Sequence, residues 1–127
     1  MKVFKHASAI WNGTVPAGTG SMKLGRAGEV LPFSLKSRVE DVPMTNPEEL
    51  IGAAHAGCFS MALSSLIEEE GKVPGTVETS AKVTLEQRDD GFWISEINLI
   101  TRGSNQAMTN DEFVALAEKA KTTCPVS

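Results

Sequence analysis

The feature that most constrains this sequence is a long apolar stretch over residues 45–67. Thr45 or Asn46 at its start can cap a helix, because a side-chain oxygen there accepts a hydrogen bond from a backbone amide that has no partner in the first turn. Pro47 suits the first helical position, where its missing N–H is no loss, and two glutamates follow at the positive end of the helix dipole. The pattern predicts a long helix over residues 47–70.

The predicted helix is apolar on most of its sides, since only His55 and a few serines interrupt the run. A helix of this kind is normally buried on several faces. We do not expect it to span a membrane, because its uninterrupted apolar stretches are much shorter than the roughly 20 residues that a span requires. A chain of this length supplies few layers to cover such a helix, so we expect a second subunit to bury the remainder. Cys58 lies in its middle.

Four extended segments are predicted before this helix, where apolar and polar residues alternate loosely. They cover residues 2–12, 21–24, 30–35 and 37–40. Pro32 confines the third segment to a sheet edge or a bend, because proline donates no hydrogen bond to a neighbouring strand.

A β-hairpin is predicted after the helix. Residues 76–88 alternate regularly, as in a half-buried strand, and Asp89-Asp90-Gly91 is a hairpin turn. Residues 92–102 form the returning strand, and their broken alternation predicts a bulge near Ser95 and Glu96.

A second helix is predicted after the hairpin, because Thr109 and Glu112 form a capping box. Its apolar face runs to about Lys121. Strands that are segregated from helices are typical of an α+β fold with antiparallel pairing. We therefore expect residues 1–127 to form one α+β domain.

The net charge and the N-terminal sequence limit the kinds of function that we expect for this chain. The chain has 127 residues and a formal net charge of −4, which argues against a nucleic-acid-binding surface. The N-terminal residues contain no apolar run long enough for a signal peptide, so we expect a cytoplasmic protein with reduced thiols.

Cysteine and histidine are the candidate chemical groups: Cys58, Cys124, His6 and His55. They lack the close pairing of ligands that a structural zinc site needs, so no metal is expected. His55 lies one turn before Cys58 and could serve it in acyl transfer, although no third group is evident. Cys124 precedes a proline in a sequence typical of a helix start, where the dipole lowers a thiol pKa. The residues alone leave open a redox pair or two unrelated buried thiols.

A resemblance favours the redox pair. The segment Thr45-Asn46-Pro47-Glu48-Glu49-Leu50-Ile51-Gly52-Ala53-Ala54-His55-Ala56-Gly57-Cys58-Phe59-Ser60-Met61-Ala62-Leu63, together with the later Cys124-Pro125-Val126-Ser127, closely resembles the OsmC branch of the OsmC/Ohr family. Members of this family are thiol-dependent peroxidases that reduce organic hydroperoxides and, in the OsmC branch, hydrogen peroxide in stress defence. The resemblance implies an intertwined homodimer with antiparallel curved sheets wrapped around long buried central helices.

The same resemblance assigns roles to four residues. It implies that Cys58 is the peroxidatic thiol and that Cys124 resolves its sulfenic acid into a Cys58–Cys124 disulfide. Arg38 corresponds to the family arginine that stabilises the thiolate and polarises the peroxide, and Glu48 to the glutamate that orients this arginine. The partners implied are a hydroperoxide and an external dithiol, typically of lipoyl type, with no metal, haem or flavin.

Two further expectations concern the limits of this resemblance. Family chains continue past the Cys-Pro-Val-Ser element with a short helix and a last strand, and we expect this chain to lack both. Helix geometry separates the backbones of Glu48 and Cys58 by about 15 Å, which favours a site that takes Glu48 from the partner subunit. Whether Arg38 comes from the same chain as Cys58 or from the partner is left open by the sequence. A rival from another class is a non-catalytic, small dimeric protein whose buried pocket holds an apolar ligand, with the cysteines only lining that pocket.

Overall fold

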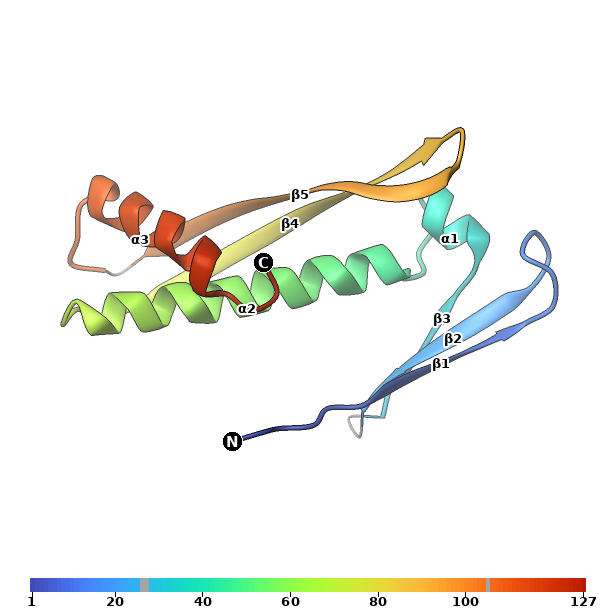
Figure 1. The fold of residues 1–127 in the computed structure, drawn as a ribbon, viewed down its shortest axis with the longest axis horizontal. Helices are drawn as coiled ribbons and strands as arrows, with labels where there is room; N and C mark the ends of the chain where they lie inside the picture. The colour runs from blue at the N-terminus through green and yellow to red at the C-terminus, as the bar shows by residue number, and fades with distance from the viewer. Residues whose placement is uncertain (26–27, 105) are drawn as a thin grey trace. The chain divides into compact units, whose positions relative to one another are not determined.

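The computed structural model describes residues 1–25, 28–104 and 106–127. The chain divides into two compact units, Met1–Leu50 and Ile51–Ser127, each of which is described by itself. The elements follow the order β1, β2, β3, α1, α2, β4, β5, α3 (Figure 1). Antiparallel sheets and a long helix confirm the predicted α+β class.

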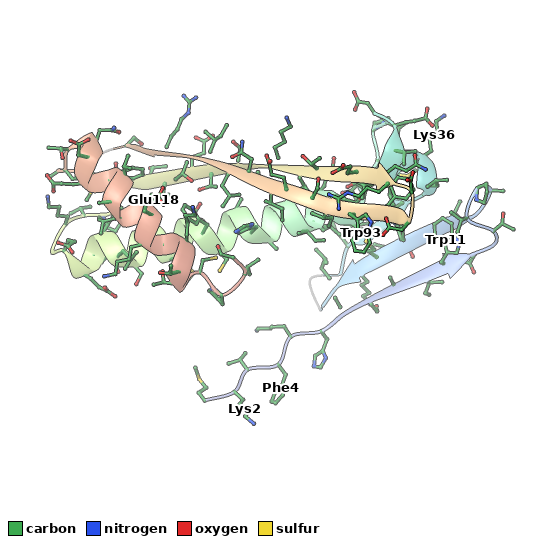
Figure 2. The ribbon with its side chains drawn as sticks, turned by 45° about the horizontal axis from the view of Figure 1, so that its top comes forward. Lys2, Phe4, Trp11, Lys36, Trp93 and Glu118 are labelled. Atoms are coloured by element: carbon green, nitrogen blue, oxygen red, sulfur yellow. The ribbon has the colours of Figure 1, made fainter. Side chains whose placement is uncertain are left out.

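The first unit contains a three-stranded antiparallel sheet in the order β1-β2-β3. Its strands are β1 (Ala7–Asn12), β2 (Thr19–Leu24) and β3 (Val30–Phe33). Pro32 lies on β3, which is an edge strand as predicted. The strand predicted over residues 2–12 begins only at Ala7, and the preceding segment, which carries Lys2 and Phe4, is exposed and forms no strand (Figure 2).

Gly20 allows the aromatic rings of Trp11 and Phe33 to approach each other across this sheet. It pairs with Trp11 on β1 and with Phe33 on β3, and the two aromatic rings approach each other with centroids 5.5 Å apart. A Cβ atom on Gly20 would lie 2.6 Å from the Trp11 ring and 2.7 Å from the Phe33 ring. A side chain at position 20 would therefore force the rings apart.

A short helix, α1 (Leu35–Val39), follows the sheet, so the strand predicted over residues 37–40 is wrong. Ser34 and Ser37 form a reciprocal capping box, in which the Ser34 hydroxyl accepts from the Ser37 amide and the Ser37 hydroxyl accepts from the Ser34 amide. This local arrangement outweighs the extended preference of Val39.

The long helix α2 (Pro47–Glu69) agrees with the prediction to within one residue. Asn46 supplies its cap, because its Oδ1 accepts from the Glu49 amide at 2.8 Å. The Asn46 amide group also donates to the Ser37 carbonyl at 2.9 Å, which ties the end of α1 to the start of α2. Sequence alone had left Thr45 and Asn46 as alternatives, and Thr45 instead bonds to the Glu49 carboxylate.

In the second unit, β4 (Thr76–Arg88) and β5 (Gly91–Ser104) form a long hairpin. Thr84 pairs with Glu96 and Leu85 with Ile94, so Ser95 is the extra residue of a bulge, as predicted. Hydroxyl groups join α2 to this hairpin, since Ser60 donates to Thr79 at 2.7 Å.

The core of the second unit forms between α2 and α3 (Asn110–Thr123). Thr109 and Glu112 cap α3 as predicted, although the helix runs two residues beyond the predicted end. The buried apolar cluster consists of residues on α2, one on α3 and the cysteine that ends it: Phe59, Leu63, Leu66, Ile67, Ala120 and Cys124.

Within one chain, α2 is less buried than its composition predicts. Ile51 and Met61 are exposed, Met61 by 78%, and no atom lies within 4 Å of the position that a Gly57 side chain would take. Length and composition alone would also allow α2 to cross a membrane, with a mean hydropathy of 1.6 over its most apolar 18 residues. The sequence argument against a span was therefore insufficient, and the role of α2 as a core helix rests on the packing of Leu63 and Ile67.

Candidate active site

The two cysteines meet in the second unit, where α2 and the end of α3 pack together. Cys58 lies in the middle of α2, and Cys124 caps the C-terminus of α3, where its amide donates to the Ala120 carbonyl at 2.9 Å. Both thiols are free, Cys58 packs against the buried cluster that contains Cys124, and each thiol shifts the pKa of the other. Packing of α3 on α2 through the fully buried Ala120 positions this pair.

The thiol pair has unequal acidity. The hydrogen bond to Cys124 raises the pKa of Cys58, and burial adds to this, although the Val126 amide opposes it by stabilising the thiolate. Burial also disfavours the thiolate of Cys124, but hydrogen bonds from the Ser127 side chain, from Cys58 and from the amides of Val126 and Ser127 outweigh it and lower the pKa of Cys124. The environment of the pair thus raises the pKa of Cys58 and lowers that of Cys124.

The location of Cys124 corrects the sequence interpretation of its acidity. The Thr-Cys-Pro segment ends α3 and does not begin a new helix. The positive end of a helix dipole is therefore absent at this thiol, and the hydrogen bonds of the following turn lower its pKa.

The turn over residues 124–127 is closed by a bond from the Ser127 amide to the Cys124 carbonyl at 3.1 Å. Its last side chain reaches α2, where His55 Nε2 lies 2.9 Å from Ser127 Oγ. His55 Nδ1 is buried and has no hydrogen-bond partner within the part of the chain that the structure describes. His55 therefore contacts the turn through Ser127, whereas the sequence had suggested it as a partner for Cys58.

The predicted arginine and glutamate form an ion pair in the first unit. Arg38 lies in the last turn of α1, and its Nε and Nη2 atoms donate to Glu48 Oε1 at 3.1 and 2.5 Å. The Glu48 side chain is only 8% exposed, while that of Arg38 is 38% exposed. The carboxylate thus holds one edge of the guanidinium and leaves part of the group open to solvent.

The structure thus brings the four predicted residues together as two pairs, each within its own unit: Arg38 with Glu48, and Cys58 with Cys124. Sequence reasoning missed the contributions of Val126 and Ser127, although both belong to the Cys-Pro-Val-Ser element. Among residues 1–25, 28–104 and 106–127, no group of three or more His, Cys, Asp or Glu side chains is placed to hold a metal ion.

A groove of about 880 Å³ adjoins the turn in the second unit. Phe59, Leu99 and Phe113 supply apolar walls, and His55 and Ser127 also line it. A small apolar molecule in this groove would therefore lie beside the residues that contact the thiol pair.

Comparison with known proteins identifies the family that this chain resembles. The family described as OsmC-like protein matches residues 40–127. Peroxiredoxin OsmC of Escherichia coli K12 is 40% identical over 129 residues, covering 100% of this chain and 90% of the relative. An organic hydroperoxide resistance protein of Xanthomonas axonopodis pv. citri is 34% identical over 85 residues, covering 65% of this chain and 57% of the relative.

Solved structures agree with this assignment. An organic hydroperoxide resistance protein from Elizabethkingia anophelis superimposes with a TM-score of 0.74 at 26% identity, over 98% of this chain and 87% of the other. OhrB of Bacillus subtilis shares the fold, with a TM-score of 0.71 at 22% identity over 94% of this chain and 86% of the other. The family match and the full-length relative together show that this chain belongs to the OsmC-like family.

Proposed function

We propose that this protein is a cysteine-based peroxidase that reduces organic hydroperoxides, and also hydrogen peroxide, to alcohol and water in oxidative or osmotic stress. The observation that carries the proposal is the pair of free thiols, Cys58 and Cys124, which two separate helices bring together at one buried cluster. Relatives that are named peroxiredoxin and organic hydroperoxide resistance proteins support this substrate class. The cycle needs only cysteine chemistry and an external dithiol.

In the first step the Cys58 thiolate attacks the terminal oxygen of the hydroperoxide. The O–O bond breaks, the alkoxide takes up a proton and leaves as the alcohol, and Cys58 becomes a sulfenic acid. The Cys124 thiolate then attacks the Cys58 sulfur, so that an S–S bond forms, the S–O bond breaks and hydroxide leaves to become water. A dithiol of the lipoyl type reduces the disulfide through a mixed disulfide and is itself oxidised.

The acidity of the pair supports a role for Arg38. The hydrogen bond to Cys124 favours the thiol form of Cys58, and no cation contributes to the pKa shift of Cys58 among the described residues. A peroxidatic cysteine needs a positive group to favour its thiolate. Arg38 remains charged at working pH and has an exposed edge, so we assign it to the Cys58 thiolate and the peroxide, with Glu48 as its positioning residue.

The exposed face of α2 supports a homodimer. Met61 is largely exposed, and Gly57 on the same face has no neighbour within 4 Å of its Cβ position. A second α2 helix on this face would bury both positions, and an antiparallel arrangement would bring the start of one helix beside the middle of the other. We therefore propose an intertwined homodimer whose Arg38 and Glu48 serve the Cys58 of the partner. We also propose that it is located in the cytoplasm, where a dithiol reductant is available.

The test is turnover of cumene hydroperoxide with dihydrolipoamide as the dithiol. Cys58→Ser should abolish peroxide consumption, whereas Cys124→Ser should form one sulfenic acid per site and then stall, with overoxidation at excess peroxide. Equal multiple turnover by both variants would overturn the assignment. Mixing Cys58→Ser with Glu48→Ala subunits tests the shared site, because heterodimers should regain activity at half of their sites.

The groove of the second unit favours one rival, a binding protein for an apolar ligand. The same assay separates the two functions. A binding protein would take up an apolar ligand without consuming peroxide, and its affinity would not depend on Cys58.

A further inference from the structure

We propose that His55 is a positioning residue for the resolving step, acting through Ser127 on the thiolate of Cys124. The proposal rests on the two-thiol cycle proposed above and adds a residue to it. His55 lies on α2 and Ser127 lies 72 positions later in the sequence, so their contact at 2.9 Å joins α2 to the turn that carries Cys124.

The direction of the hydrogen bonds follows from counting hydrogens. A serine hydroxyl has one hydrogen to donate. His55 Nδ1 is buried with no acceptor beside it among the described residues, so the imidazole hydrogen lies on Nε2. Ser127 Oγ then accepts from His55 at 2.9 Å, and its own hydrogen is left for the Cys124 thiolate, in keeping with the lowering of the pKa of Cys124 by Ser127. The result is a relay of donors that runs from His55 to Ser127 and ends on Cys124.

The unpaired nitrogen of His55 agrees with this assignment. His55 Nδ1 is buried without a partner, and a hydrogen on it would point at nothing that accepts. An unprotonated Nδ1 leaves only an unused lone pair, which is the less costly alternative. Nδ1 makes no hydrogen bond among the described residues, so the polar contribution of His55 comes from the donor on Nε2.

The relay acts on the second step of the cycle. Cys124 must attack the Cys58 sulfenic acid as a thiolate, and the turn must hold its sulfur against Cys58. The bond to His55 anchors the Ser127 end of the turn, while the bond from the Cys124 amide to Ala120 anchors the other end. Loss of the hydrogen bond from His55 should have two effects at once. It should release the turn, and it should weaken the hydrogen bond from the Ser127 hydroxyl to the Cys124 thiolate.

The experiment separates the two steps by rapid mixing of the reduced chain with one equivalent of cumene hydroperoxide. Trapping with a sulfenic-acid reagent follows the rise and decay of the Cys58 sulfenic acid, and mass analysis follows the disulfide. His55→Leu and Ser127→Ala should each slow disulfide formation about tenfold relative to sulfenic acid formation, as expected for the loss of one hydrogen bond to a charged group. The double variant should be no slower than either single variant.

His55→Gln and His6→Leu are the matched controls. The glutamine amide can donate to Ser127 from the position of Nε2, so it should restore most of the rate, whereas His6 is exposed in the first unit and its replacement should change neither step.

Three results would overturn the proposal: disulfide formation at the wild-type rate in His55→Leu, equal slowing in His55→Leu and His55→Gln, or additive slowing in the double variant. Failure of the two-thiol cycle itself would appear differently, because the wild-type chain would then form no Cys58–Cys124 disulfide at all.

Discussion

The ion pair between Arg38 and Glu48 predicts an asymmetry in stability. Arg38→Met keeps most of the aliphatic stem but leaves the Glu48 carboxylate, only 8% exposed, without its cation. Breaking a fully buried pair in this way costs about 3–5 kcal/mol. Because the Arg38 side chain is 38% exposed and solvent screens that side of the pair, we expect about 2–3 kcal/mol here.

The reverse change should cost less. Glu48→Gln leaves a guanidinium that already reaches water, and the glutamine oxygen can still accept from it, so we expect about 1 kcal/mol for the weakened hydrogen bond. The lost charge in the first turn of α2 adds up to about 0.5 kcal/mol. The arginine variant should therefore be the less stable of the two by about 1 kcal/mol.

Urea unfolding at one fixed protein concentration measures this difference. With a slope of about 2 kcal/mol per molar urea, the two midpoints should differ by about 0.5 M. Lys121→Met is the control, because its ion pair with Glu118 is exposed on both sides and its loss should not move the midpoint. A Glu48→Gln variant as unstable as Arg38→Met would refute the reasoning, since the stranded carboxylate would then not determine the cost.

Three further predictions concern the scaffold. Leu63→Ala should lower the free energy of unfolding by about 2–5 kcal/mol, measured in urea, because Leu63 is fully buried in the core of the second unit. Gly91→Ala should cost about 1–3 kcal/mol, since Gly91 has a φ of +130°, and calorimetry should show a lower melting temperature. Hydrogen bonds, first from Lys72 and then from Thr109, lower the pKa of Glu112 below its ordinary value of 4.5. The resulting stability is complete above that value and is lost as the pH falls through the lowered pKa, so Glu112→Gln should flatten the decline of the urea midpoint between about pH 5 and pH 3.

The alternation of apolar and polar residues predicted the strands of the second unit well, because a half-buried strand turns successive side chains to opposite faces. The alternation over residues 76–88 gives β4 its actual bounds, and the broken alternation after Ile94 locates the bulge at Ser95. One element of the first unit depended on a subtler signal. The helix α1 rests on a capping box in which Ser37 takes the place of the usual acidic or amide residue, so the motif was missed.

Long-range contacts limited the prediction of the site. The link between His55 and Ser127 depends on how α3 packs on α2, and neither residue carries a signal of this partner. The Thr-Cys-Pro segment suggested a helix start because the proline after Cys124 suits both the first turn of a helix and the position after its end. Only the packing decides between these two, and it also determines which groups donate to the thiol.

The β4–β5 hairpin makes the newly synthesised chain prone to aggregate. Among the described residues its strands pair only with each other, so the outer edge of each remains open along its length. Open strand edges invite pairing with other chains, and a two-stranded ribbon is only marginally stable by itself. While these edges are open the chain is thus exposed to aggregation, and its yield on refolding should depend on protein concentration. The bulge at Ser95 and the charged Lys82 and Glu86 lessen that hazard, because they make each edge a poorer template.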